Sequence, residues 1–159
     1  MVFSKLEIEK VKVCDCMAGS SEDTSNVFMR RISAKKHKKG DFKIQLEKDD
    51  VPPANTCDDH CGQREISINK VDGYKEEEIV LDYKKKLIIQ KMYSPKIDFI
   101  YLKFKFEIGA GNVKSTPQHG HESHFDFYKS DDFSVEKIKP VEDAIVVSFT
   151  NEEYKEIVE

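Results

Sequence analysis

The stretch IYLKFKFEI, from Ile100 to Ile108, decides the fold class of this 159-residue chain. Apolar side chains occupy every second position, and charged side chains fill most of the positions between them. This period of two predicts a β-strand with one face in the core and the other in water. Such one-sided burial is typical of an antiparallel sheet.

Shorter segments elsewhere in the chain show the same alternation. We expect further strands at about residues 6–13, 27–32, 42–46, 66–68, 125–127, 133–135 and 145–149. Residues 109–123, between two of these strands, are rich in glycine and histidine and are expected to form a long loop.

One segment, about residues 75–93, has helical periodicity. Its apolar side chains recur every three or four residues, which places them on one face of an amphipathic helix. Glutamates fill its first turns and lysines its last turns, in agreement with the helix dipole. Asp72 is the expected cap. The sequence Thr150-Asn151-Glu152-Glu153 has the form of a capping box and predicts a short C-terminal helix.

The strands do not alternate regularly with helices, so we do not expect a doubly wound sheet. We predict an α+β fold, a predominantly antiparallel sheet with one main amphipathic helix packed on one face and a short C-terminal helix. The length predicts a single domain that covers residues 1–159.

The charge balance limits the classes of partner. The chain has 30 acidic and 26 basic residues, a formal net charge of −4, which argues against general nucleic-acid binding. A local nucleic-acid surface at the basic segment 30–43 is therefore the weaker alternative. No apolar stretch has the length of a membrane span, and charges within the first seven residues argue against a secretion signal. We therefore expect a cytoplasmic protein without a membrane partner.

Four cysteines form two closely spaced pairs, Cys14-x-Cys16 and Cys57-x3-Cys61. Two such thiolate pairs can complete a tetrahedral zinc site, and a closed site of this kind would tie two loops together. The alternatives are four reduced thiols and, less favoured in a cytoplasmic chain, disulfides. Thiol catalysis by Cys61 beside His60 is a further alternative, although adjacent residues rarely face one substrate.

Three of the five histidines, His119, His121 and His124, lie within six residues. Imidazoles can bind a transition metal, here with Glu122 or Asp126 as an oxygen ligand. They can also exchange protons near neutral pH in acid–base catalysis. The third interpretation is a polar surface loop without a chemical role.

Two functions follow from these features. The first is a small binding protein for a protein partner, with a structural zinc ion at Cys14, Cys16, Cys57 and Cys61. The alternative is a phosphodiester hydrolase in which His119, His121 and His124 act as acid, base or metal ligands. In that case Arg30, Arg31 or Arg64 would hold the phosphate through a bidentate contact.

Overall fold

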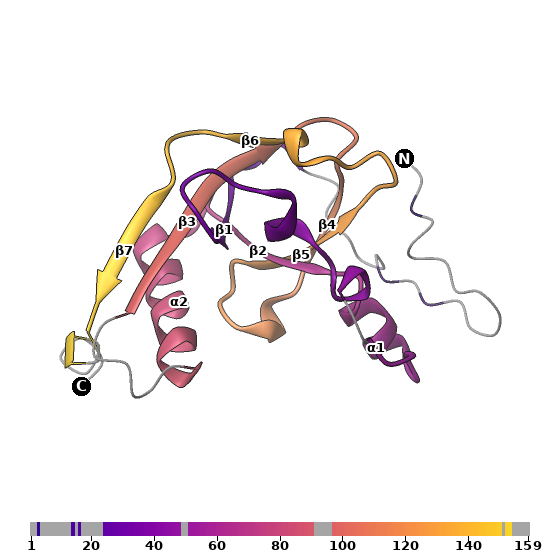
Figure 1. Cartoon of the computed structure of the whole chain (residues 1–159), viewed down its shortest axis with the longest axis horizontal. Coiled ribbons are helices and arrows are strands. Elements are labelled where there is room, and N and C mark those ends of the chain that lie inside the picture. Colours follow the sequence, from indigo (N-terminus) through magenta and orange to yellow (C-terminus); the bar gives the residue numbers. More distant parts are fainter. Residues whose placement is uncertain are drawn as a thin grey trace.

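An antiparallel sheet dominates the structure, a computed structural model that describes residues 3, 14, 16, 24–48, 51–90, 97–150 and 152–153. Its strands are β1 (Phe28–Ile32), β2 (Ile66–Lys70), β3 (Ile97–Phe106), β4 (Gly111–Ser115), β5 (His124–Lys129), β6 (Ile138–Pro140) and β7 (Ile145–Phe149). They pair in the order β4-β5-β2-β1-β3-β6, and β7 pairs with the first half of β3. The sheet is strongly curled (Figure 1). The predicted antiparallel α+β fold class is confirmed at this level.

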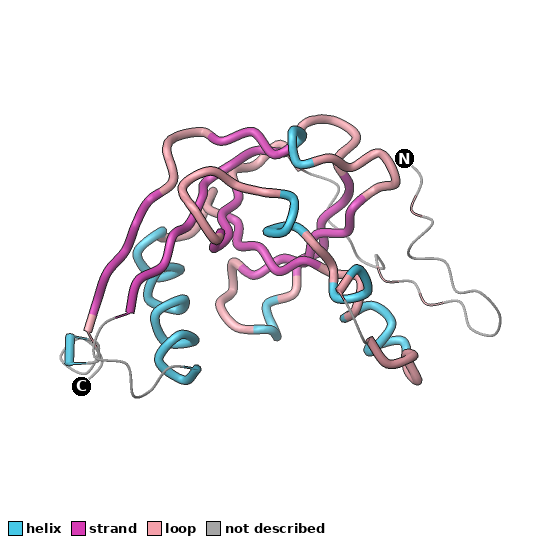
Figure 2. Tube along the Cα trace, in the orientation of Figure 1, coloured by secondary structure: helices cyan, strands magenta, loops and turns pink. Residues whose placement is uncertain are grey.

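The helical elements are few among the described residues (Figure 2). They are α1 (Cys57–Gly62), α2 (Glu76–Gln90) and the 3-10 turns η2 (Lys39–Phe42), η3 (Gln45–Glu47), η4 (Pro117–His119) and η5 (Val135–Lys137). None of the described helices has the length and hydrophobicity needed to cross a bilayer.

Apolar side chains bury both faces of β3 rather than one. Leu102 and Phe104 belong to a core on one face, and Phe99 and Tyr101 pack with α2 on the other. The expectation of a wet second face holds for Lys105 and Glu107, which are exposed, but it was wrong at Tyr101, where α2 covers the strand. Ile108, expected in the core, lies beyond the strand end and is 95% exposed.

A chain of buried hydrogen bonds fixes the histidine loop to α2. The Tyr83 hydroxyl on α2 donates to Asn69 Oδ1 on β2 at 2.8 Å, and Asn69 Nδ2 donates to Ser123 Oγ at 2.9 Å. Buried polar groups that are fully paired in this way specify one arrangement of the segments they join. The loop that contains η4 therefore lies on the same side of the sheet as α2 (Figure 1).

Four predicted local structures were wrong. Residues 133–135 were expected to form a strand, but they form a loop and the start of η5. Residues 42–46 form 3-10 turns rather than a strand, because the Asp41 carboxylate accepts from the backbone N–H groups of Ser33 and Lys38 and closes a turn. The expected loop 109–123 contains β4. Asp72 does not cap α2 but accepts a hydrogen bond from the Val27 N–H. The strand expected at residues 6–13 lies outside the described residues.

The expected capping box at the C-terminal end has the predicted hydrogen bonds. The Glu153 N–H donates to Thr150 Oγ1, and the Thr150 N–H donates to Glu153 Oε2, both at 3.1 Å. The helix expected to follow lies largely outside the described residues.

Candidate metal centre

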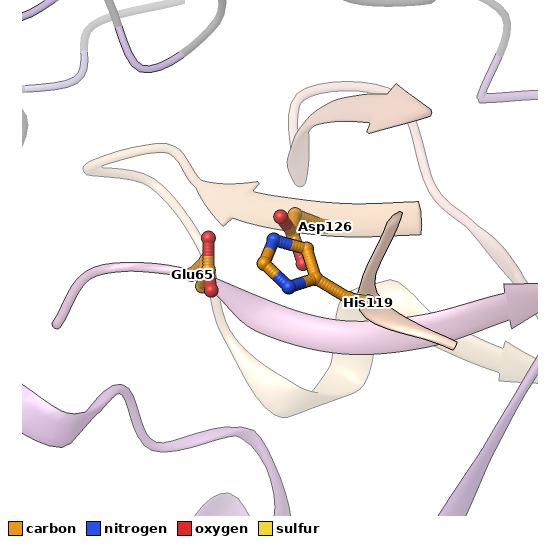
Figure 3. A group of neighbouring side chains, drawn as sticks. All are labelled: Glu65, His119 and Asp126. Carbon is orange, nitrogen blue, oxygen red and sulfur yellow. The ribbon is translucent and has the colours of Figure 1, made fainter. Parts of the chain in front are cut away.

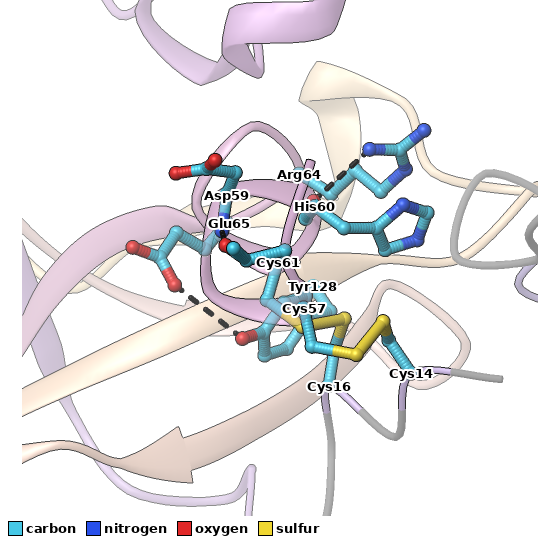
Figure 4. Close-up of a disulfide and its surroundings, with 10 residues drawn as sticks. Cys14, Cys16, Cys57, Asp59, His60, Cys61, Arg64, Glu65 and Tyr128 are labelled. Carbon is cyan, nitrogen blue, oxygen red and sulfur yellow. Dashed lines mark hydrogen bonds between the residues drawn. A yellow bond between two sulfur atoms is a disulfide. The ribbon is translucent and has the colours of Figure 1, made fainter. Parts of the chain in front are cut away.

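The four cysteines form two disulfides, Cys14–Cys57 and Cys16–Cys61 (Figure 4). The two pairs meet because α1 places Cys57 and Cys61 one turn apart on the same helical face. Thr56 begins this helix by accepting a hydrogen bond from the Asp59 N–H at 3.1 Å. A four-thiolate zinc site does not fit this arrangement, because zinc binds thiolates and each sulfur here is bonded to another sulfur.

The disulfides lie directly beside one residue of β5. Cys14, Cys16 and the ring of Tyr128 form a buried cluster, and the Tyr128 hydroxyl lies 3.4 Å from Glu65 Oε2 (Figure 4). The cysteines therefore support the segment that leads from α1 to β2 and contains Glu65.

Two of the three histidines of the predicted site come together: the ring centroids of His119 and His124 lie 5.6 Å apart. His124 lies in β5 and is buried, whereas His121 contacts Ser123 Oγ at 2.9 Å and Glu78 Oε2 at 3.4 Å. Burial, reinforced by the nearby Lys86 and His119, lowers the pKa of His124 to about 4. His124 is therefore neutral near pH 7, and only His119, at the end of η4, is exposed.

The arginines of the predicted phosphate site make structural contacts. Arg30 donates to the carbonyl oxygens of Asp41 at 2.8 Å and Ser67 at 2.6 Å. Arg64 donates to the His60 carbonyl at 3.0 Å. These bonds tie both guanidinium groups to the backbone, and His60 itself is buried in α1. The geometry gives no support to an arginine phosphate clamp beside the histidines.

His119 instead meets two carboxylates from different elements. Glu65 immediately precedes β2 and Asp126 lies in the middle of β5, and the ligand atoms of all three residues lie within 4.8 Å of one another (Figure 3). Asp126 is 1% exposed, and its Oδ1 has no hydrogen-bond partner among the described residues. An unpaired buried carboxylate oxygen costs free energy unless a cation or a donor compensates it.

Asp126 keeps its carboxyl proton to an unusually high pH. Burial, followed by the hydrogen bond and charge of Glu65, raises the pKa of Asp126 to about 8. The Thr116 hydroxyl and the Lys114 ammonium act in the opposite direction but more weakly. Near pH 7 Asp126 is therefore largely protonated, because burial and the neighbouring carboxyl group disfavour its ionisation.

A divalent cation is the natural replacement for that proton. One imidazole and two carboxylates form a mixed nitrogen and oxygen donor set that suits Zn²⁺ or Mn²⁺. Three protein ligands leave coordination positions open, as in catalytic rather than structural metal sites.

Sequence reasoning identified His119 and Asp126 as metal-ligand candidates but missed Glu65. Glu65 lies far from the histidine loop in sequence and next to the first residue of a strand. Only the pairing of β2 with β5, in which Ser67 lies opposite Asp126, brings it to the site.

Comparison with known proteins finds no matching family, no matching curated protein and no matching solved structure.

The two disulfides should stabilise the fold non-additively. Each closes a loop of 43 or 45 residues, for which chain entropy gives about 4 kcal/mol. Once one bond is closed, the other closes a loop of only a few residues and contributes about 2 kcal/mol. Urea unfolding of the Cys14→Ser/Cys57→Ser protein should therefore show a loss of about 2 kcal/mol, and removal of both bonds a loss of about 6 kcal/mol.

The Cys16→Ser/Cys61→Ser protein is the matched control and should lose the same amount as the first pair. A fourfold variant that loses no more than either pair alone would contradict this account of the disulfides.

Asp126 should make stability of the metal-free protein depend on pH. Its folded pKa of about 8 lies above the usual value, so its stabilising contribution is complete below pH ~4 and is lost as pH rises to about 8. The side chain of the Asp126→Asn protein cannot ionise at this position. As the pH rises, the free energy of unfolding of the variant should therefore increase relative to that of the wild type, by up to about 1.4 kcal/mol per pH unit. Urea unfolding from pH 5 to 8.5 in EDTA measures this difference.

Both proteins retain His124, whose lowered pKa has the opposite effect below pH ~6.5, so that contribution cancels in the comparison. A difference between the two proteins that stays constant across the pH range would show that Asp126 ionises normally.

Proposed function

We propose that this chain is a small binding protein with a divalent metal ion, Zn²⁺ or Mn²⁺, bound by Glu65, His119 and Asp126. The observation that carries the proposal is the buried Oδ1 of Asp126, which has no hydrogen-bond partner among the described residues and lies beside a second carboxylate and an imidazole. The zinc expected from the sequence is thereby assigned to a different set of ligands. A metal here would compensate the buried charge and replace the Asp126 proton.

The scaffold in this proposal is the architecture expected from the sequence, with α2 as the main amphipathic helix and a short helix at the C-terminal end. Its function as a partner for another protein remains part of the proposal. Nucleic acid is the less favoured partner because the net charge is −4.

The two disulfides favour an oxidising compartment over the cytoplasm as the site of action. Disulfides persist where the surroundings are oxidising and are rare where glutathione keeps thiols reduced. This inference replaces the expected cytoplasmic location, which rested on the short apolar stretches of the sequence and the charges within its first seven residues.

Direct titration with metal tests the central proposal. Calorimetry at pH 7.5 should show one Zn²⁺ or Mn²⁺ bound per chain with release of about one proton, the one held by Asp126. Glu65→Gln, His119→Gln and Asp126→Asn each remove one ligand and should weaken binding at least about tenfold.

His121→Gln is the matched control, because His121 contacts Ser123 and Glu78 rather than the two carboxylates. Equal weakening by His121→Gln and His119→Gln, or no binding by the wild type, would refute the assignment.

Metal-dependent hydrolysis of phosphodiesters is the second candidate function. Its specific support is the three-residue ligand set with exposed His119, which leaves a position where a metal could activate water. The metal-loaded protein should then hydrolyse bis(4-nitrophenyl) phosphate, and His119→Gln should abolish this activity. Absence of turnover in a protein that binds metal stoichiometrically would leave metal binding alone as the function.

A further inference from the structure

One face of strands β2, β5 and β4 has a polar side chain at every position. Residues directly opposite each other in an antiparallel sheet share a face, so the strand register defines its rows. The central row is Ser67, Asp126 and Lys114, and the flanking rows contain Asn69 with His124 and Tyr128 with Asn112.

The opposite face of the same strands is apolar and buried. Its side chains are those of Ile66, Ile68, Val113, Phe125 and Phe127, all in one core. The two faces of these strands therefore differ in kind: one is an apolar core face and the other is polar. They form the floor of a polar surface beside the Glu65–His119–Asp126 centre, and Ser67 in the central row is exposed.

Lys114 is a cation of this surface. It lies directly opposite Asp126 in the register, and its charge acts on the Asp126 carboxyl. Lys114 is half-buried, and no ion pair with a carboxylate is found for it among the described residues. Its ammonium is thus available to a ligand that approaches from the polar face.

A bound divalent cation gives the centre a positive charge. With a divalent cation, two ionised carboxylates, a neutral imidazole and Lys114, the centre carries about one positive charge. Open metal positions next to a lysine can bind the oxygens of one anion together.

We infer that the metal-loaded centre binds a phosphate group, with two anchors: the open positions of the metal and the ammonium of Lys114. Lysine is a common phosphate ligand that acts as a point charge. The exposed Ser67 hydroxyl and the Asn112 amide, in the same or the next row, supply hydrogen-bond donors at the edge of this site. Lys114 thus has the phosphate-binding role that the sequence analysis assigned to the arginines. This inference rests on the proposed metal centre.

The test measures two affinities in each protein: Mn²⁺ for the metal-free chain, and inorganic phosphate for the Mn²⁺-loaded chain, both by calorimetry. Lys114→Met should weaken phosphate binding at least tenfold. The same substitution should leave Mn²⁺ binding unchanged or tighter, because it removes a positive charge near the ligands. A variant that misfolds would instead lose both affinities. Weaker phosphate binding together with unchanged or tighter Mn²⁺ binding is therefore specific to the loss of the Lys114 charge.

Lys105→Met is the matched control. Lys105 is an exposed lysine near the C-terminal end of strand β3, which β1, β2 and β5 separate from β4. It should change neither affinity. Mn²⁺ binding without phosphate binding, or phosphate binding that Lys114→Met leaves intact, would overturn the inference and leave the metal centre standing. Absence of Mn²⁺ binding by the wild type would overturn both.

Discussion

The position of β5 between β2 and β4 is the constraint on which the rest of the site depends. Because successive residues of a strand point to opposite faces, β5 sends Phe125 and Phe127 into the apolar core and Asp126 to the polar side. A shift of one residue in this register would exchange the two sets, burying a carboxylate among phenylalanines. The core contacts thus hold Asp126 at a buried position where its charge needs a partner.

Parts of the molecule on either side of β5 hold the segments that contain the other two ligand candidates. On one side, the Tyr83–Asn69–Ser123 hydrogen bonds hold the loop that carries His119 against the sheet. On the other, the disulfides and Tyr128 support the segment that ends in Glu65. Two neighbouring ligand candidates and a third that is distant in sequence are therefore positioned by packing and covalent bonds rather than by one local motif.

The sequence predicted those parts of the fold in which a single periodicity dominates. Strand β3 and helix α2 follow from alternation and from helical spacing, because their own side chains form the two cores. Strand β4 was missed because its glycine and polar residues resemble a loop. A side chain at Gly111 would place its Cβ 2.1 Å from the Tyr128 carbonyl oxygen, so this close strand approach requires glycine.

The site was predictable only in part, because local sequence patterns do not show which distant segments pair. His119 and Asp126 stand close together in a chemically distinctive segment, whereas Glu65 joins them only through strand pairing. The spacing of the cysteines indicated two pairs that could meet, but spacing does not distinguish thiolates around zinc from disulfides. The arginines were rare enough to suggest a phosphate site, yet their hydrogen bonds go to backbone carbonyls.

The most direct test of the central claim is a crystal structure of the protein grown with Zn²⁺ and measured at the zinc absorption edge. The account predicts an anomalous peak about 2.0–2.2 Å from a nitrogen of His119 and from oxygens of Glu65 and Asp126. Zinc bound elsewhere, with no anomalous peak beside Glu65, His119 and Asp126, would contradict it.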